Sequence, residues 1–235
     1  MNNEPPNWLY DETKHVGVDY ANLEQVQRYD SMHQAFRDYE AITEAIVHRL
    51  GLGRESTVID LGAGTGAFTI NAAKHCQQVY AVDISRAMIE CCRAKAEAAG
   101  LQNVACRVGG FLTYEHDSEP VEAVVSIFAL HHVPDFWKLE ALKRVARMLR
   151  DKGRLFLSDI VFPSQNENLE STINDWIKEM AKRAGPELAT EVAVHVQEEY
   201  STYDWIMEGL LQRAGFNIDD IERDGLQTTY ICTKF

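Results

Sequence analysis

Three glycines and two acidic residues in the first third of the chain have the types and spacing of a nucleotide-binding site. An apolar run that begins at Val58 ends in Asp60, and the residues after it read Leu-Gly-Ala-Gly-Thr-Gly. A second apolar run, Val79–Val82, ends in a second acid, Asp83. Glycines at this spacing permit a tight turn and let a ligand approach the backbone closely. An acid that closes a strand can accept hydrogen bonds from ribose hydroxyls.

The glycine spacing, together with Asp60, distinguishes this turn from a dinucleotide-binding turn. The dinucleotide fingerprint reads G-x-G-x-x-G and places a pyrophosphate at a helix N-terminus. This chain instead has glycines at 62, 64 and 66, with a carboxylate two residues before the first of them. A carboxylate repels a pyrophosphate and attracts a cation. The motif therefore favours a cationic nucleoside such as S-adenosylmethionine and disfavours a nicotinamide-dependent dehydrogenase.

Alternating strands and helices must position these residues. Apolar runs predict strands at 57–60, 79–82, 104–108, 122–127, 153–160, 216–222 and 227–233. Helical periodicity predicts helices at 66–76, 85–99, 137–149 and 203–214. Such alternation predicts a parallel sheet with helices on both faces. The acids and glycines then lie at the carboxyl ends of the strands, where ligands bind in open α/β sheets.

Four segments, in this order, resemble the class I S-adenosylmethionine-dependent methyltransferases. The first two are Asp60–Gly66 and Ala81–Ser85, which resemble the first two motifs of that family. Val124–Asp135 resembles the fourth strand and its loop in the small-molecule branch, which includes quinone-biosynthesis methylases. Leu142–Asp159 resembles the next helix, glycine turn and fifth strand. The resemblance covers roughly residues 40–161 and 201–235.

The resemblance implies an α/β fold with a Rossmann-like, seven-stranded, mostly parallel sheet. The implied strand order is 3-2-1-4-5-7-6, with the last strand antiparallel, helices on both faces and a small helical cap. We expect residues 41–162 to form the cofactor-binding core and residues 201–235 to complete its sheet. Residues 1–40 are expected to form an N-terminal helical lid, and residues 163–200 a helical cap inserted into the core.

The resemblance also implies S-adenosyl-L-methionine as the cofactor and assigns its contacts. Asp60 is expected near the amino group of the cofactor, Asp83 on the ribose, and Ile84 with Met88 on the adenine. The expected cofactor-binding residues are Asp60, Gly62, Ala63, Gly64, Gly66, Asp83, Ile84, Met88, Gly110, Phe111 and Phe128.

The third predicted strand departs from the family pattern. The family usually has a Gly-Asp pair after this strand, and its acid accepts a hydrogen bond from the adenine amino group. Here Gly110 stands in place of that acid. Phe111 could contact the base, and backbone groups at 110–111 could supply its hydrogen bonds. One such bond is worth about 0.5–1.5 kcal/mol, so the change weakens the adenine contact without removing the site.

His131 and His132 follow the fourth predicted strand and are the candidate catalytic bases, because histidine titrates near neutral pH. The same histidines can instead cap the loop or contact the cofactor. Transfer of a methyl group from a sulfonium needs alignment and exclusion of water more than a catalytic group. Asp159 has no visible carboxylate cluster around it, so no metal site is predicted. The candidate lid residues over a substrate are Tyr20, Tyr29, His33 and Tyr200.

Composition restricts the acceptor. The formal net charge is −13, from 23 basic and 36 acidic side chains, and such a surface opposes binding to nucleic-acid phosphates.

No apolar run approaches the ~18 residues that span a bilayer, and the polar start has no secretory-signal pattern. Five cysteines without a C-x-x-C pair indicate reduced thiols in the cytoplasm.

The sequence thus predicts a cytoplasmic methyltransferase that acts on a small molecule. A protein or RNA methyltransferase, and a catalytically inactive cofactor-binding partner or sensor, remain alternatives. The methylated atom and the oligomeric state stay open, because the segments that would choose the acceptor carry no decisive motif.

Overall fold

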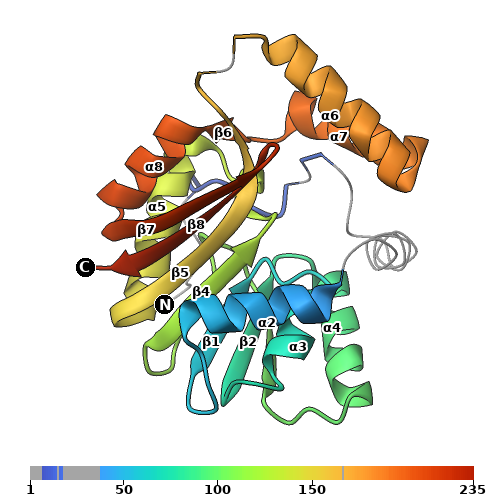
Figure 1. Ribbon diagram of the computed structural model, residues 1–235. Helices are drawn as coiled ribbons and strands as arrows, with labels where there is room; N and C mark the ends of the chain where they lie inside the picture. Colours follow the sequence, from blue (N-terminus) through green and yellow to red (C-terminus); the bar gives the residue numbers. More distant parts are fainter. Residues whose placement is uncertain (1–6, 15, 18–37, 166) are drawn as a thin grey trace.

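An eight-stranded sheet forms the centre of the computed structural model, which describes residues 7–14, 16–17, 38–165 and 167–235 (Figure 1). The strands are β1 (Thr57–Leu61), β2 (Gln78–Asp83), β3 (Val104–Val108), β4 (Val121–Ile127), β5 (Leu149–Phe162), β6 (Thr202–Tyr203), β7 (Phe216–Asp224) and β8 (Gln227–Lys234). The strands β1 and β4 are almost fully buried, as parallel strands covered by helices on both faces require.

The seven long strands have the order β3-β2-β1-β4-β5-β8-β7, and β6 pairs with β5 at one side. The pairings from β3 to β5 are parallel, whereas β8 is antiparallel to both β5 and β7. This is the predicted order, with the last strand antiparallel. The sequence missed the two-residue strand β6, which is too short to show a pattern.

Helices cover both faces of the sheet. They are α2 (Tyr39–Leu50), α3 (Ala67–Ala72), α4 (Arg86–Ala98), α5 (Asp135–Met148), α6 (Leu169–Ala184), α7 (Pro186–Glu198) and α8 (Asp204–Arg213), with a 3₁₀ turn η1 (Leu130–His132). Local signals set their ends: the Asp38 side chain caps α2, and Gly51 ends it in a left-handed conformation. The helix α3 is shorter than the predicted 66–76, because the chain turns after Ala72 toward β2.

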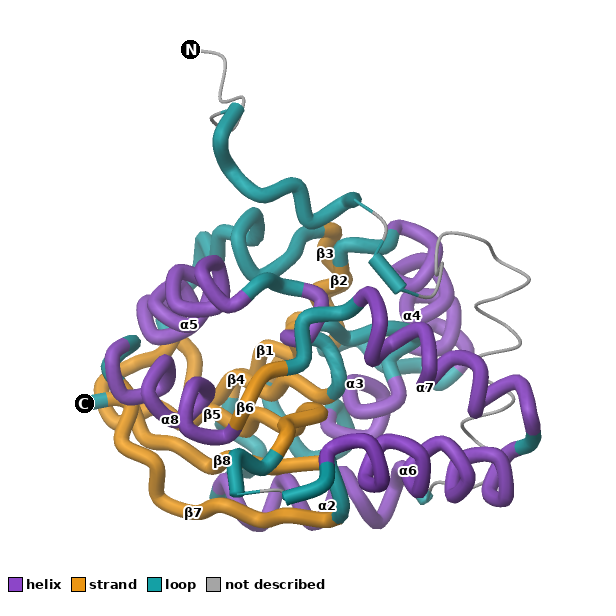
Figure 2. Tube along the Cα trace, turned by 90° about the horizontal axis from the view of Figure 1, so that it is seen from above, coloured by secondary structure: helices purple, strands orange, loops and turns teal. Residues whose placement is uncertain are grey.

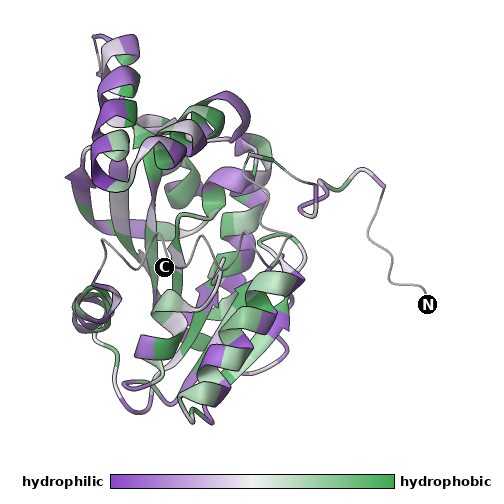
Figure 3. Ribbon diagram, turned by 90° about the vertical axis from the view of Figure 1, so that its right-hand side faces the viewer, coloured by the Kyte–Doolittle hydropathy of each residue, from purple (hydrophilic) through white to green (hydrophobic). Residues whose placement is uncertain are grey.

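Two apolar clusters hold the helices against the sheet. On one face, Ile46 of α2 and Phe68 of α3 pack with Val58 and Val125. On the other face, Leu142 of α5 and Leu211 of α8 belong to the cluster that contains Ile59 and Val124. Successive strand residues point to opposite faces, so β1 and β4 contribute to both clusters. Figure 3 shows that the flanking helices carry polar as well as apolar residues.

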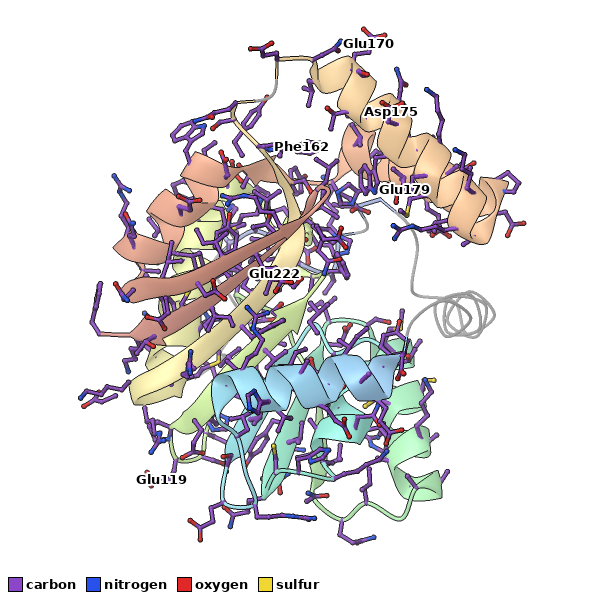
Figure 4. All side chains as sticks on the ribbon, viewed as in Figure 1. Glu119, Phe162, Glu170, Asp175, Glu179 and Glu222 are labelled. Carbon is purple, nitrogen blue, oxygen red and sulfur yellow. The ribbon has the colours of Figure 1, made fainter. Side chains whose placement is uncertain are left out.

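The helices α6 and α7 form a hairpin that extends away from the sheet at the end where the parallel strands finish (Figure 1). They occupy the positions of two helices that the sequence predicts at 169–183 and 187–197. No residue of α6 is buried, and Glu170, Asp175 and Glu179 lie along it (Figure 4). Among the described helices, none is long and apolar enough to cross a membrane.

Candidate active site

The glycine turn between β1 and α3 is built from three residues with positive φ, namely 81° at Gly62, 53° at Gly64 and 88° at Gly66. A Cβ atom on Gly62 would collide with Ala129, which follows β4, and one on Gly66 would lie 2.5 Å from the Cys92 sulfur. A Cβ on Gly64 would meet no atom within 4 Å. Gly62 and Gly66 are therefore needed for packing, while Gly64 leaves the turn open to a ligand.

Asp60 lies at the end of β1, directly under this turn, and is buried. Its Oδ2 atom accepts a hydrogen bond of 2.5 Å from the Thr69 hydroxyl. Burial raises the pKa of the Asp60 carboxyl to about 7, and the nearby Asp83 adds to the rise while Thr69 opposes it. Such a carboxyl holds a proton near neutral pH unless a cation faces it.

Asp83, at the end of β2, connects the glycine turn to α4. Its Oδ2 atom accepts a hydrogen bond from the Gly64 amide at 2.8 Å, and its Oδ1 atom accepts one from the Ser85 amide at 2.8 Å. Burial raises the pKa of Asp83, and the two backbone amides oppose that rise. The structure thus brings together Asp60, Asp83 and Gly64 at the carboxyl ends of β1 and β2.

At the end of β3, a side chain from the N-terminal segment occupies the space beside Gly110. A Cβ on Gly110 would lie 2.5 Å from the Oε1 atom of Glu12. The Oε2 atom of Glu12 accepts hydrogen bonds from the Leu112 amide at 2.9 Å and from the Thr113 hydroxyl at 3.0 Å. The Glu12 carboxylate therefore lies beside Gly110, where the family usually has an acid. Glu12 precedes Gly110 by about a hundred residues along the chain.

The remaining residues expected around the cofactor lie on the same edge, with differing burial. Phe111 is buried in the apolar cluster with Val82, so its ring packs in the core. Met88 and Ala63 are buried, and Ile84 is half-buried. Phe128 has a φ of 53°, a conformation rare for an aromatic residue and typical of strained functional loops.

His131 lies in η1 between two carboxylates. Its Nδ1 atom is 2.5 Å from the Oδ1 atom of Asp159, and its Nε2 atom is 3.3 Å from the Oε2 atom of Glu199. The Asp159 carboxylate also accepts hydrogen bonds from the His131 amide at 3.0 Å and from the Ile160 amide at 2.8 Å. Burial lowers the pKa of His131, but the two carboxylates outweigh it and raise that pKa above its usual value.

Glu199, just after α7, also contacts the Nδ1 atom of His195. The Nε2 atom of His195 is 2.7 Å from the Ser201 hydroxyl. Burial raises the pKa of Glu199, but the hydrogen bond from His195 and the charge of His131 reverse this, so the net pKa is lowered. A row of polar groups thus runs from Asp159 in the core to Ser201 beside the cap helices.

His132 differs from its neighbour. Burial, with the charge of His131, lowers the pKa of His132 to about 4, so this imidazole is neutral at physiological pH. The two rings are stacked at a tilt, with centroids 4.4 Å apart. The Tyr10 hydroxyl donates a hydrogen bond of 3.4 Å to the His132 carbonyl. These contacts place the N-terminal segment against the histidine pair and the end of β3, and Figure 2 shows the segment passing close to β3.

Backbone contacts hold Glu199 in place. The Tyr200 amide donates to the His131 carbonyl at 2.8 Å, and the buried Lys138 ammonium donates to the Tyr200 carbonyl. The Tyr10 and Tyr200 rings meet edge to face, with centroids 6.4 Å apart. Of the four predicted lid residues, Tyr200 lies at this site. The other three, Tyr20, Tyr29 and His33, lie outside the described residues.

Comparison with known proteins identifies the class. Residues 58–153 match the family described as "Methyltransferase domain". A protein named as an uncharacterised methyltransferase from Bacillus cytotoxicus is 27% identical over 212 residues, covering 90% of each chain. One from Anoxybacillus flavithermus is 29% identical over 200 residues, covering 82% of this chain and 86% of that one.

The fold agrees with these sequence matches. The crystal structure of a SAM-dependent methyltransferase from Aquifex aeolicus superimposes with a TM-score of 0.64 at 17% identity, covering 91% of this chain and 99% of that one. The sheet order, the glycine turn and the matched domain define a class I methyltransferase. The chain is an S-adenosylmethionine-dependent methyltransferase of this class.

Sequence reasoning missed the partners of the histidine pair. The sequence gives no partner for Asp159 and no signal that marks Glu199, His195 or Glu12 as site residues. Glu199 and Glu12 lie far from His131 and Gly110 along the chain, so no spacing could link them. Gly110 stands where the family usually has an acid, and this departure is the one signal that another part of the chain supplies a carboxylate there.

Proposed function

We propose that this methyltransferase transfers the methyl group of S-adenosylmethionine to a small molecule bound between the carboxyl ends of β1–β5, the N-terminal segment and α7. The observation that carries the proposal is that segments of the same chain cover this edge. Glu12 contacts Leu112, Tyr10 contacts His132, and Tyr200 contacts His131. A site covered in this way suits a small acceptor better than a folded polymer.

The residues present fit the cofactor. Gly64 leaves the turn open, and the two carboxyls of Asp60 and Asp83 meet the positive charge of S-adenosylmethionine without a competing anion. Asp60 would face the ammonium group, which favours its ionised form, and Asp83 would hold the ribose hydroxyls. Ile84 and Met88 would contact the adenine.

When bound, the cofactor supplies a methyl group already activated on a sulfonium. The protein then has to align the acceptor and exclude water. His131 is a poor candidate for a base because both ring nitrogens face carboxylates. His132 is neutral but weakly basic. We therefore assign both histidines to binding and orientation of the acceptor.

Location in a reducing compartment, the cytoplasm, agrees with the cysteines. All five are free, and four of them are buried, which is typical of cytosolic proteins. The formal charge of −13 also supports a small acceptor over RNA.

The test is transfer of labelled methyl from S-adenosylmethionine into separated small-molecule, protein and RNA fractions of a cell extract. Label in the small-molecule fraction supports the proposal, and the Asp83→Ala variant should lose that transfer. Label confined to protein or RNA would overturn the acceptor class. Calorimetric binding of the cofactor with no label in any fraction would mean that the chain is an inactive cofactor-binding partner or sensor.

A further inference from the structure

Three groups that commonly bind transition metals converge at the end of β4. One ligand atom from each of His131, His132 and Glu199 lies within 4.8 Å of the others. The Nδ1 atom of His195 contacts the same Glu199 carboxylate. Imidazole and carboxylate together are the usual ligands of Zn²⁺ and of other first-row divalent ions.

The separation of the ligand atoms suits one ion. Two ligands at 2.0–2.1 Å from a tetrahedral Zn²⁺ lie about 3.3 Å apart. The Nε2 atom of His131 and the Oε2 atom of Glu199 are separated by 3.3 Å. These two atoms can therefore bind a common ion with little movement.

The surrounding contacts orient the ligands as metal sites require. A histidine that binds a metal through one ring nitrogen usually donates its other N–H to a carboxylate or carbonyl. The Nδ1 atom of His131 faces Asp159 at 2.5 Å, which leaves Nε2 directed toward Glu199. For His195, the Ser201 hydroxyl at 2.7 Å occupies Nε2, which leaves Nδ1 directed toward the same carboxylate.

The electrostatic balance also calls for a cation. Asp159 and Glu199 are buried side chains on either side of His131. The ammonium of Lys138 lies nearby but is engaged by Asp135 at 2.8 Å and by the Tyr200 carbonyl. Two buried carboxylates favour a positive charge between them, which either a protonated His131 or a bound cation can supply.

We propose that His131, His132 and Glu199 bind one divalent transition-metal ion, with His195 hydrogen-bonded to the Glu199 ligand. The site lies at the same edge of the sheet as the glycine turn, because Ala129, two residues before His131, abuts Gly62. A metal here would hold an oxygen of the acceptor at this edge of the sheet. Binding of the ion itself does not depend on the proposed acceptor class.

The experiment uses the full chain, freed of metal with a chelator and titrated with Co²⁺ and with Zn²⁺ in the absence of S-adenosylmethionine. Visible absorption reports the coordination of Co²⁺, and calorimetry gives the stoichiometry and affinity for Zn²⁺. We expect one ion per chain. The affinity should fall at least tenfold in Glu199→Gln and in His132→Gln, and also in Asp159→Asn through the lost orientation of His131.

The matched control is His48→Ala, because His48 is exposed on α2 and lies away from the cluster. It should bind Zn²⁺ as the wild type does. Circular dichroism of each metal-free variant shows whether it folds, and a rise in the wild-type unfolding temperature with Zn²⁺ tests the site without any substitution. The proposal would be overturned if the wild type bound no stoichiometric ion. It would also be overturned if Glu199→Gln and His132→Gln bound Zn²⁺ as tightly as the wild type does. In either case the cluster would be a hydrogen-bonded link between α7 and the core.

Discussion

The Asp60 carboxyl carries a proton in the folded chain at pH values where a free aspartate is ionised. Its pKa is raised to about 7 by burial, against about 3.9 in an unfolded chain. Between these values the folded state binds more protons than the unfolded state, so the free energy of unfolding falls as pH rises. The contribution of Asp60 to the free energy of unfolding is fully present below about pH 4 and is lost above about pH 7.

The Asp60→Asn variant should remove this pH dependence. We expect the wild type, without cofactor, to lose up to about 1.4 kcal/mol per pH unit from this group between pH 5 and pH 7. The variant should lose less, so its stability relative to the wild type should improve with rising pH. Urea unfolding midpoints at several pH values measure this, with the exposed Glu44→Gln as control. Parallel curves for Asp60→Asn and the wild type would contradict it.

The Asp83→Asn variant should bind S-adenosylmethionine more weakly. Asp83 is the proposed acceptor for the ribose hydroxyls, and the asparagine amide would offer them a neutral acceptor in place of a charged one. Loss of a charge-assisted hydrogen bond costs about 1.5–3 kcal/mol, which corresponds to a roughly tenfold to hundredfold rise in Kd. Isothermal titration calorimetry checks this prediction. Unchanged affinity would remove Asp83 from the cofactor site.

Glu12 is one of several residues that hold the N-terminal segment to the core, beside Tyr10 and Gly17. Glu12→Ala removes the acceptor of two hydrogen bonds and leaves the Leu112 amide without its partner. We expect a loss of about 1–3 kcal/mol in the free energy of unfolding and faster proteolysis within residues 7–14. Glu12→Gln should recover part of the loss, and the exposed Glu119→Ala should change neither quantity. Equal protease resistance in wild type and Glu12→Ala would disprove the role of this contact.

The N-terminal segment lies against Glu199 at Gly17, which has no side chain to collide with that residue. The φ of Gly17 is 76°, and a Cβ there would collide with the Glu199 carboxyl. Gly17→Ala should therefore destabilise the protein by about 1–3 kcal/mol. Gly225→Ala is the control, because Gly225 has a φ of 60° but open space around it, so this substitution costs only the backbone strain of a positive φ. Denaturant unfolding compares the two variants. If Gly17→Ala lowered the free energy of unfolding no more than Gly225→Ala does, the collision with Glu199 would be excluded.

The elements were predictable because their signals are local. Alternating apolar runs and the caps at Asp38 and Gly51 lie within a few residues of the structure they specify. The glycine turn and the two acids were found for the same reason. Glu12 and Glu199 act across about a hundred and about seventy residues of chain, so their contacts depend on packing that periodicity does not encode. The sequence predicts no metal site, because Glu199 meets His131 and His132 only in the folded chain.

At the scale of the whole molecule, the acidic surface predicts weak binding to nucleic acid. With a formal charge of −13, phosphate backbones are repelled rather than neutralised. We expect no saturable binding to a mixed RNA pool at near-physiological salt in a filter-binding assay. A salt-dependent complex that competes with methyl transfer would instead favour an RNA acceptor. The Lys143→Ala variant, in the one basic stretch of the sequence, would then show whether that stretch is responsible.

The position of β8 has a consequence for the nascent chain. This strand, Gln227–Lys234, is made last of the eight, yet it lies in the sheet between β5 and β7. Until it leaves the ribosome, the long edge of β5 has no antiparallel partner, and open strand edges pair readily with other chains. The half with the glycine turn can form early, whereas the sheet is sealed only after β8 has been synthesised. Polypeptides released before residue 227 should therefore depend on chaperones and be cleared rather than accumulate as partial enzymes.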